Sequence, residues 1–144
     1  MAERLNIIGA GHVGTTLGIL FAREGYEIDS VLARTEASAA RAARLIGYGE
    51  AVMDLDSLAP ADFSLITTPD DKIAETAQAL AASGRLAPGS VAFHCSGATS
   101  AEALAVLRSA SVAIASVHPL KTFTDPIRDA ESFQGTFCAL DGDD

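Results

Sequence analysis

The sequence predicts an α/β fold: a doubly wound, mainly parallel sheet with helices on both faces. Short apolar runs alternate along the chain with segments whose apolar residues recur at helical spacing. The helical segments are about 10–13 residues long, enough for the crossovers that parallel strands require. A Gly-rich turn joins the first strand to the first helix. The 144 residues suffice for one domain of this kind.

The first strand and the first helix meet at this turn. Residues 4–8 form a short apolar run, as expected of a strand covered on both faces. Val13, Leu17 and Phe21 then recur at helical spacing, and Gly25 stands where a C-terminal cap belongs.

The second strand and helix precede a weakly patterned stretch. Residues 27–33 form the strand, Thr35 offers an N-cap for an Ala-rich helix over residues 36–46, and Gly47 ends that helix. In the stretch that follows we expect only a short edge strand near residues 51–53.

The second half continues the alternation. Pro69 closes a buried strand, and Thr99 and Glu102 have the spacing of a capping box at the start of a later helix. A loop with Pro119 and Pro126 precedes the last strand. The expected elements are strands at residues 62–67, 90–95, 112–117 and 136–140, and helices at residues 71–83 and 100–109.

The charge and composition of the chain exclude several classes of binding partner. The chain has 19 acidic and 10 basic residues, a formal charge of -9, which argues against nucleic acid or an anionic membrane as partner. No apolar stretch approaches the ~20 residues that cross a bilayer, and no secretory signal is visible. Cys95 and Cys138 lie in apolar strand-like runs without metal-ligand spacing, so we expect no metal and two buried free thiols in a cytoplasmic protein.

The Gly-rich turn has the features of a dinucleotide-binding loop. The run Gly9-Ala10-Gly11-His12-Val13-Gly14 matches GxGxxG between a strand and a helix. Gly9 would permit the tight turn, Gly11 would let the backbone approach a pyrophosphate, and Gly14 would let the helix pack closely on the strand. The helix N-terminus supplies free N–H groups to the phosphates. His12 occupies a variable position and is expected only to border the cofactor.

The end of the second strand indicates which nucleotide binds. An NAD site places a carboxylate there, whereas an NADP site needs a cation and a hydroxyl for the 2′-phosphate. Arg34 and Thr35 stand at this point, so we expect NADP(H), with Arg34 as the phosphate clamp and Thr35 as a second donor. Arg41 and Arg44 are candidate supplements, although a solvated helix face explains them better. A methyltransferase that uses S-adenosylmethionine also has a Gly-rich first loop, but it would place an acidic residue where Arg34 stands, so the sequence disfavours this alternative.

Polar residues also follow three later strands. Thr67, Thr68 and Pro69 would meet the nicotinamide ribose, and Asp70 is expected to cap the next helix.

Two further strand ends would face the substrate. Ser96 and the backbone of Gly97 are placed to donate to an oxyanion or carboxylate, and His118 is a candidate acid or base. A loop-ordering histidine explains His118 equally well. Lys121 would bind a substrate carboxylate or phosphate, or is a solvated lysine.

With GAGHVG, ART, TTPD, HCSGA and VHPLKTF in this order, the chain resembles the N-terminal Rossmann-like domain of a family of predicted NADP-dependent oxidoreductases. That family is similar to pyrroline-5-carboxylate reductase, prephenate dehydrogenase, the deazaflavin-dependent NADP reductases and the β-hydroxyacid dehydrogenases. The last two motifs are the more specific ones. The resemblance places Gly9, Gly11, Gly14, Arg34 and Thr35 at the adenine half of the cofactor, Thr67, Thr68 and Pro69 near the nicotinamide, and Ser96, Gly97 and His118 near the substrate.

The resemblance also implies a second domain. Proteins of these groups continue into a helical domain that closes the substrate pocket and usually forms the dimer. Residues 1–144 are therefore expected to be the dinucleotide-binding domain without that helical domain. We expect this domain to form a homodimer or to associate with a separate helical domain. Two functions stay open: an oxidoreductase domain that moves hydride to or from a small carbonyl, imine or hydroxy acid, or a non-catalytic NADP(H) sensor or regulatory module.

Overall fold

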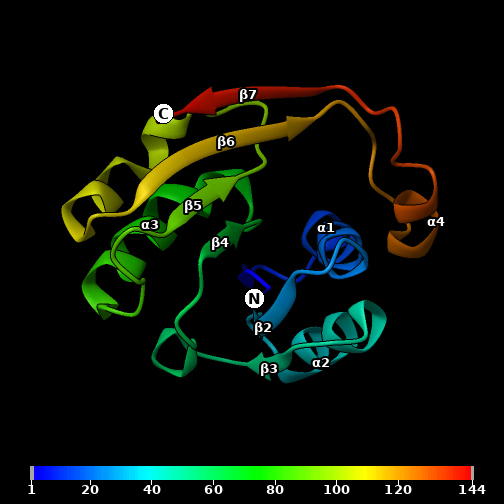
Figure 1. Cartoon of the computed structure of the whole chain (residues 1–144), viewed down its shortest axis with the longest axis horizontal. Coiled ribbons are helices and arrows are strands. Elements are labelled where there is room, and N and C mark those ends of the chain that lie inside the picture. The colour runs from blue at the N-terminus through cyan, green and yellow to red at the C-terminus, as the bar shows by residue number, and fades with distance from the viewer. Residues whose placement is uncertain (1, 144) are drawn as a thin grey trace.

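A single seven-stranded sheet organises the chain, with helices on both faces (Figure 1). The computed structural model describes residues 2–143. The strands lie in the order β3-β2-β1-β4-β5-β6-β7, and all neighbours are parallel except β6 and β7. They are β1 (Arg4–Ile8), β2 (Glu27–Leu32), β3 (Glu50–Val52), β4 (Phe63–Ile66), β5 (Val91–His94), β6 (Ala113–Pro119) and β7 (Cys138–Gly142). The predicted fold class is confirmed.

The two faces of the sheet are covered by different helices. The helices are α1 (His12–Arg23), α2 (Glu36–Ile46), α3 (Ile73–Ser83) and α4 (Pro126–Glu131), with 3-10 segments η1 (Leu55–Ser57), η2 (Asp70–Lys72) and η3 (Ala101–Ala110). One core cluster joins α1, α2 and α4 to the sheet, and a second joins α3 and η3 to its other face. Within β1, Leu5 and Ile7 enter the first cluster while Ile8 enters the second. Burial on both faces explains the unbroken apolar run.

The start of α2 follows the sequence closely. Thr35 is extended and its side-chain oxygen accepts the N–H of Ser38, while Gly47 ends the helix in the left-handed region. Both caps and both bounds of this helix were predicted correctly.

Several boundaries differ from prediction. Residues 101–110 form a 3-10 helix rather than an α-helix, and its N-cap is Ser100 instead of Thr99. Asp70 caps no helix, because it is itself the first residue of η2 and Pro69 precedes it. In the loop expected around Pro126, Asp125 caps the short helix α4 and Pro126 occupies its first turn. The last strand begins two residues later than expected, at Cys138.

The two cysteines are not alike. Cys95 is partly buried, but Cys138 is exposed, so the prediction that both thiols are buried is wrong for Cys138. Every residue of β7 is exposed, which an apolar run cannot reveal by itself. Burial, followed by the nearby thiol of Cys138, raises the pKa of Cys95 to about 12.

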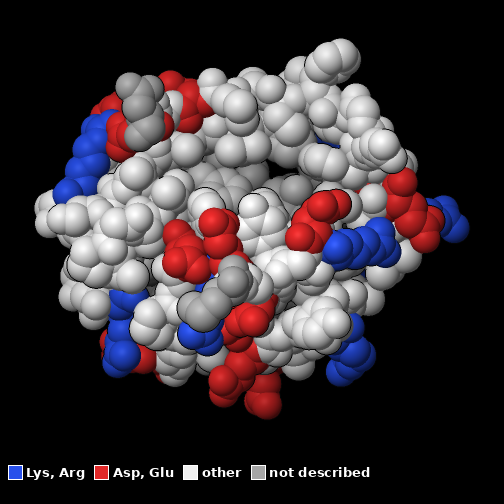
Figure 2. Space-filling model, viewed as in Figure 1, with Lys and Arg blue, Asp and Glu red and all other residues white. Residues whose placement is uncertain are grey.

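Charged residues are interspersed over the surface. On the face shown in Figure 2, Lys and Arg side chains lie among Asp and Glu side chains. Across residues 2–143, the structure contains no helix with the length and apolar character needed to cross a membrane.

Candidate functional site

A groove opens at the carboxyl ends of the central strands. Strands β1 and β4 are neighbours, but the chain leaves β1 toward α1 on one face and β4 toward α3 on the other. Open α/β sheets bind ligands at such a reversal. The groove has a volume of about 830 Å³. Its lining residues are Ile8, Gly9, Ala10, Gly11, Leu32, Ala33, Arg34, Thr35, Ser38, Leu55, Thr67, Thr68, Pro69, Lys72, Glu75, Thr76 and Ala79.

The Gly-rich turn forms the floor of this groove. Gly9 adopts a φ of +108°, which side chains rarely tolerate, and its N–H donates to the carbonyl of Leu32 at 2.9 Å. The Thr67 hydroxyl donates to the Gly9 carbonyl at 2.8 Å, which ties the turn to the end of β4. A Cβ on Gly14 would collide with that carbonyl and with Thr67, whereas a Cβ on Gly11 would meet nothing within 4 Å.

The start of α1 leaves hydrogen-bond donors free. Gly11 is its N-cap and makes no side-chain cap hydrogen bond, and no side chain of residues 2–143 bonds to the first-turn N–H groups. Open space at Gly11 and free N–H groups suit a pyrophosphate. His12 and Val13 belong to this turn of the helix but do not line the groove, so the structure separates them from Gly9, Ala10 and Gly11.

One wall of the groove comes from the start of α2. Arg34, Thr35 and Ser38 line it, and Arg34 is exposed with no ion pair among residues 2–143. The two candidate supplements, Arg41 and Arg44, lie farther along α2 and do not line the groove.

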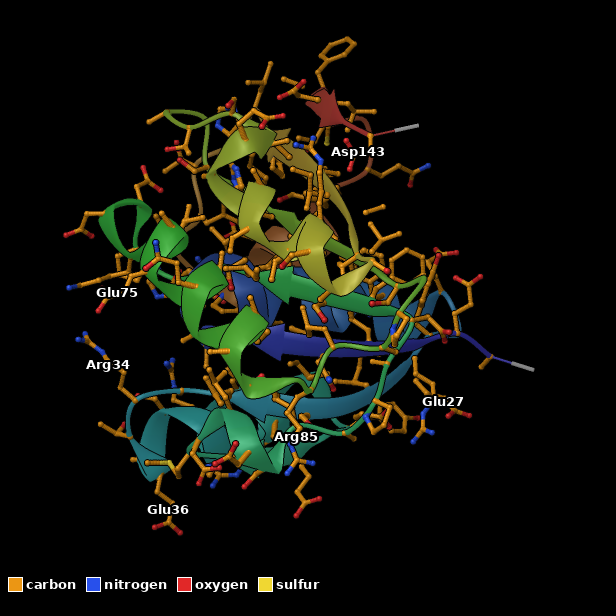
Figure 3. The ribbon with its side chains drawn as sticks, turned by 90° about the vertical axis from the view of Figure 1, so that its left-hand side faces the viewer. Glu27, Arg34, Glu36, Glu75, Arg85 and Asp143 are labelled. Carbon is orange, nitrogen blue, oxygen red and sulfur yellow. The ribbon has the colours of Figure 1, made fainter. Side chains whose placement is uncertain are left out.

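The opposite wall includes residues that sequence reasoning missed. Lys72 and Glu75 form an ion pair at 3.4 Å, and the apolar part of this wall includes Ala79 of α3. Figure 3 shows Arg34 and Glu75 at the groove mouth, reaching toward one another from opposite walls. The sequence shows that Lys72, Glu75 and Ala79 have helical spacing and so share one helix face. Only the folded structure shows that this face lies across the groove from Arg34.

One polar atom at the groove lacks a partner. The Oγ1 atom of Thr68 is buried and has no hydrogen-bond partner among the described residues. A buried hydroxyl without a partner is costly, and a ligand in the groove could supply that partner. Thr67, Thr68 and Pro69 all line the groove, and their expected contact with the nicotinamide ribose stays a prediction.

Ser96 and His118 lie at the next two strand ends. Ser96 is buried, and its hydroxyl accepts the N–H of Ala98 at 3.2 Å. The imidazole of His118 packs directly on Gly97, where a Cβ would collide with the ring. Ser96, Gly97 and His118 therefore form a second cluster, and none of them lines the groove.

Lys121 is engaged by two residues of the chain, Ser132 and Asp129. Its Nζ donates to the Ser132 hydroxyl at 2.9 Å and lies 3.9 Å from an Asp129 carboxylate oxygen. Burial acts to raise the pKa of Asp129, but the N–H groups of Asp125 and Thr124, with Lys121, outweigh it and hold the pKa below its usual value. Lys121 thus anchors the loop before α4.

No group of three or more His, Cys, Asp or Glu residues within residues 2–143 is arranged to hold a metal ion. His94 is instead fully buried and bonded within its own loop.

Comparisons with solved structures find the same fold at low sequence identity. A Bacteroides fragilis protein described as a "putative NADP oxidoreductase" is similar with a TM-score of 0.81 and 21% identity, over 99% of this chain and 52% of that one. Prephenate dehydrogenase from Aquifex aeolicus, solved with hydroxyphenyl propionate and NAD+, is similar with a TM-score of 0.74 and 16% identity. This match covers 97% of this chain and 50% of that one. Arogenate dehydrogenase from Synechocystis is similar with a TM-score of 0.70 and 19% identity, over 85% of this chain and 42% of that one.

The chain therefore spans about half the length of these proteins or less. No curated protein sequence matches it significantly. A family model described as a Rossmann-like domain matches residues 2–119, which include β1 through β6 and every residue that lines the groove. The chain belongs to the Rossmann-like domain family.

Proposed function

We propose that the chain binds NADP(H) and forms the nucleotide-binding part of an oxidoreductase acting on a small carbonyl, imine or hydroxy acid. The observation that carries the proposal is one continuous groove from the Gly-rich turn to Arg34. The two nearest acids to the end of β2 do not enter it: Asp29 is bonded to Arg4 at 2.7 Å, and Glu36 does not line the groove. The carboxylate that does line the groove, Glu75, belongs to the opposite wall and is paired with Lys72 at 3.4 Å. A cation with no carboxylate on its own wall favours a 2′-phosphate over a free ribose hydroxyl.

The residues present fit the parts of the nucleotide. Gly11 leaves space for the pyrophosphate at the start of α1, and Arg34 would hold the 2′-phosphate. The apolar side chains of Leu32, Leu55 and Ala79 would enclose the adenine ring. Thr68 Oγ1 would gain a partner from the nicotinamide half.

When bound, the nicotinamide supplies hydride transfer, and the chain supplies binding, orientation and charge. Ser96 is proposed to donate to a substrate oxygen, because its oxygen already accepts the Ala98 N–H and leaves the hydroxyl proton free. His118 is proposed as the proton donor or acceptor at the same end of the sheet, held in place by its packing on Gly97. Lys121 is assigned no contact with substrate, since Ser132 and Asp129 engage it.

One observation favours a second function. Ser96 and His118 lie outside the groove that would hold the nucleotide. A module that binds NADP(H) without turning over a substrate needs the groove alone, so a sensor or regulatory role is the second candidate.

Calorimetric titration with NADPH and NADH tests the nucleotide proposal. We expect NADPH to bind at least 10-fold more tightly, since one charge-assisted contact contributes about 1.5–3 kcal/mol. Equal affinities would contradict the proposal. Steady-state NADPH oxidation with a panel of imines and 2- or 3-keto acids then separates the two functions, because the sensor binds NADPH tightly and turns over none of them.

A further inference from the structure

Strand β7 is an open edge of the sheet, along its outer margin in Figure 1. Every residue of the strand is exposed, although it pairs with β6 from Cys138 to Gly142. A free strand edge presents N–H and C=O groups with which another strand can pair. The edge of β7 is therefore a surface whose backbone chemistry calls for a strand as its partner.

The hydrogen bonds to β6 show which backbone groups of this edge are free. The N–H of Leu120 donates to the carbonyl of Phe137 at 2.8 Å, and the N–H of Asp143 donates to the carbonyl of Ile114 at 2.9 Å. Residues 137 and 143 thus turn their backbone groups toward β6. Because inward and outward residues alternate in an antiparallel ladder, every second residue between them turns its groups away from β6. These outward-facing residues are Cys138, Leu140 and Gly142.

The usual protections of an edge strand are absent from β7. The strand contains no Lys, Arg or Pro, and its register against β6 is unbroken. Nearby carboxylates are bonded to η3: Asp141 accepts the N–H of Ala101 at 3.0 Å, and Asp143 pairs with Arg108 at 2.7 Å. They therefore repel an approaching strand less than free carboxylates would. The opposite edge, β3, is by contrast only three residues long.

Apolar side chains accompany the free backbone groups. Leu140 is 74% exposed, and Phe137, just before the strand, is 81% exposed. Leu140 stands opposite Val117 of β6, which packs against the core cluster on the α1 side of the sheet. Leu140 thus extends this apolar sheet face to the open edge.

We propose that β7 pairs antiparallel with β7 of a second copy of this chain, around a two-fold axis between the two Leu140 residues. In this register Leu140 faces Leu140 and Cys138 faces Gly142, so every outward N–H and C=O group of both strands finds a partner. The two Leu140 side chains meet on the same sheet face, and each Asp141 stands opposite Ala139. A shift of two residues leaves Cys138 or Gly142 unpaired, and one such shift sets the two Asp141 residues opposite one another.

The charge of the chain predicts how this dimer responds to salt. Each copy has a net charge of -9, so the two copies repel one another overall. Salt screens that repulsion, and the dimer should therefore become stronger between 0.05 M and 0.5 M NaCl, each taken as a rough working value. The contact is small, so we expect a reversible dimer with a dissociation constant on the order of 100 µM at the higher salt. The inference does not depend on nucleotide binding.

Sedimentation equilibrium of the whole chain tests the dimer. Leu140→Lys should raise its dissociation constant roughly 10-fold or more, because two cations then stand opposite one another. The matched control is Met53→Lys, which changes another exposed apolar residue, directly after β3, and should leave the dimer unchanged. A wild-type chain that stays monomeric at about 1 mM overturns the proposal. A dimer that Leu140→Lys does not weaken, or one that salt weakens, overturns it too.

Disulfide trapping tests the register. In a Cys95→Ser, Cys138→Ser background, Leu140→Cys places one thiol on each side of the two-fold axis. Directly paired residues have Cα atoms about 5.5 Å apart, within reach of a disulfide. Oxidised glutathione, which takes up the two electrons and two protons of the thiols, should therefore cross-link this variant into a covalent dimer. Met53→Cys in the same background controls for random collision, and equal cross-linking of the two variants would overturn the two-fold pairing.

Discussion

The ring of His94 joins two points of one loop: its Nε2 lies 2.8 Å from the carbonyl oxygen of Ser100, and its Nδ1 accepts the N–H of Ser96 at 3.1 Å. The side chain is fully buried. Because Nδ1 accepts, the proton of the neutral ring is on Nε2 and is donated to Ser100. His94 therefore holds the loop that positions Ser96 and Gly97.

Replacing His94 should destabilise the fold. His94→Phe keeps a buried ring but leaves the N–H of Ser96 and the carbonyl of Ser100 without partners, at a cost of about 2–4 kcal/mol. Urea unfolding measures the change. His12→Phe at an exposed position is the control, with an expected change of less than about 0.5 kcal/mol. Equal stability of the two variants would contradict a structural role for His94.

Arg34→Ala should weaken NADPH selectively. Loss of a charge-assisted bond to phosphate costs about 1.5–3 kcal/mol, while NADH affinity stays nearly constant. Arg41→Ala removes a cation from α2, the helix that follows this connection, at a position outside the groove, so it should change neither affinity. Calorimetry with both nucleotides gives the comparison, and a parallel loss of NADH in Arg34→Ala would argue against the phosphate contact.

Two glycines of the turn should respond differently to alanine. Gly11→Ala adds a methyl into open space and should cost less than about 1 kcal/mol in stability, yet weaken NADPH and NADH alike by blocking the pyrophosphate. Gly14→Ala drives its methyl into the Gly9 carbonyl and Thr67, so its main effect is about 1–3 kcal/mol of lost stability. Paired unfolding and binding measurements separate the two. Normal binding by a stable Gly11→Ala protein would refute the pyrophosphate site.

The two thiols should differ in reactivity. At pH 8, a disulfide reagent should label the exposed Cys138 quickly and Cys95 slowly, since burial raises the pKa of Cys95 to about 12 and only the thiolate attacks. Cys138→Ser should abolish the fast phase and Cys95→Ser should retain it. Two equally fast thiols in the folded protein would show that Cys95 is open to solvent.

Acid should weaken the attachment of β7. The hydrogen bond from Arg108, then that from the Ile114 N–H, holds the pKa of Asp143 below its ordinary value of 3.8. A lowered folded pKa means that this stabilisation is present above the ordinary value and is lost as the pH falls through the folded one. Asp143→Asn should therefore be less stable than wild type at pH 7 and nearly equal to it at pH 2. If the difference in stability between wild type and Asp143→Asn persists at pH 2, the ionised carboxylate is not its cause. Asp56→Asn, at an exposed position, is the control.

The sequence was most informative where local chemistry decides the structure. The strand ending at Gly9, the Thr35 cap and the Gly47 terminus were all predicted at the correct residues, because each depends on its own neighbours. The residues directly after β1, β2 and β4 that the sequence assigns to the nucleotide line one groove, since parallel strands end at one edge of a sheet, and their contact with a nucleotide stays a prediction.

Features that depend on distant contacts were missed. The hydrogen bond between the Thr35 and Ser38 hydroxyls depends on side-chain rotamers that no sequence pattern specifies. Lys121 meets Asp129 only because the loop after β6 folds back into α4. The exposure of Cys138 follows from its place on the sheet edge, which periodicity does not distinguish from a buried strand.

The bond from Thr67 to the Gly9 carbonyl fixes the turn before any ligand arrives. Its kinetic consequence is that nucleotides should dock without waiting for a slow rearrangement, so NADPH and NADH should associate at similar rates. Discrimination between them would then reside in how long each one stays, and NADPH should have the longer residence time.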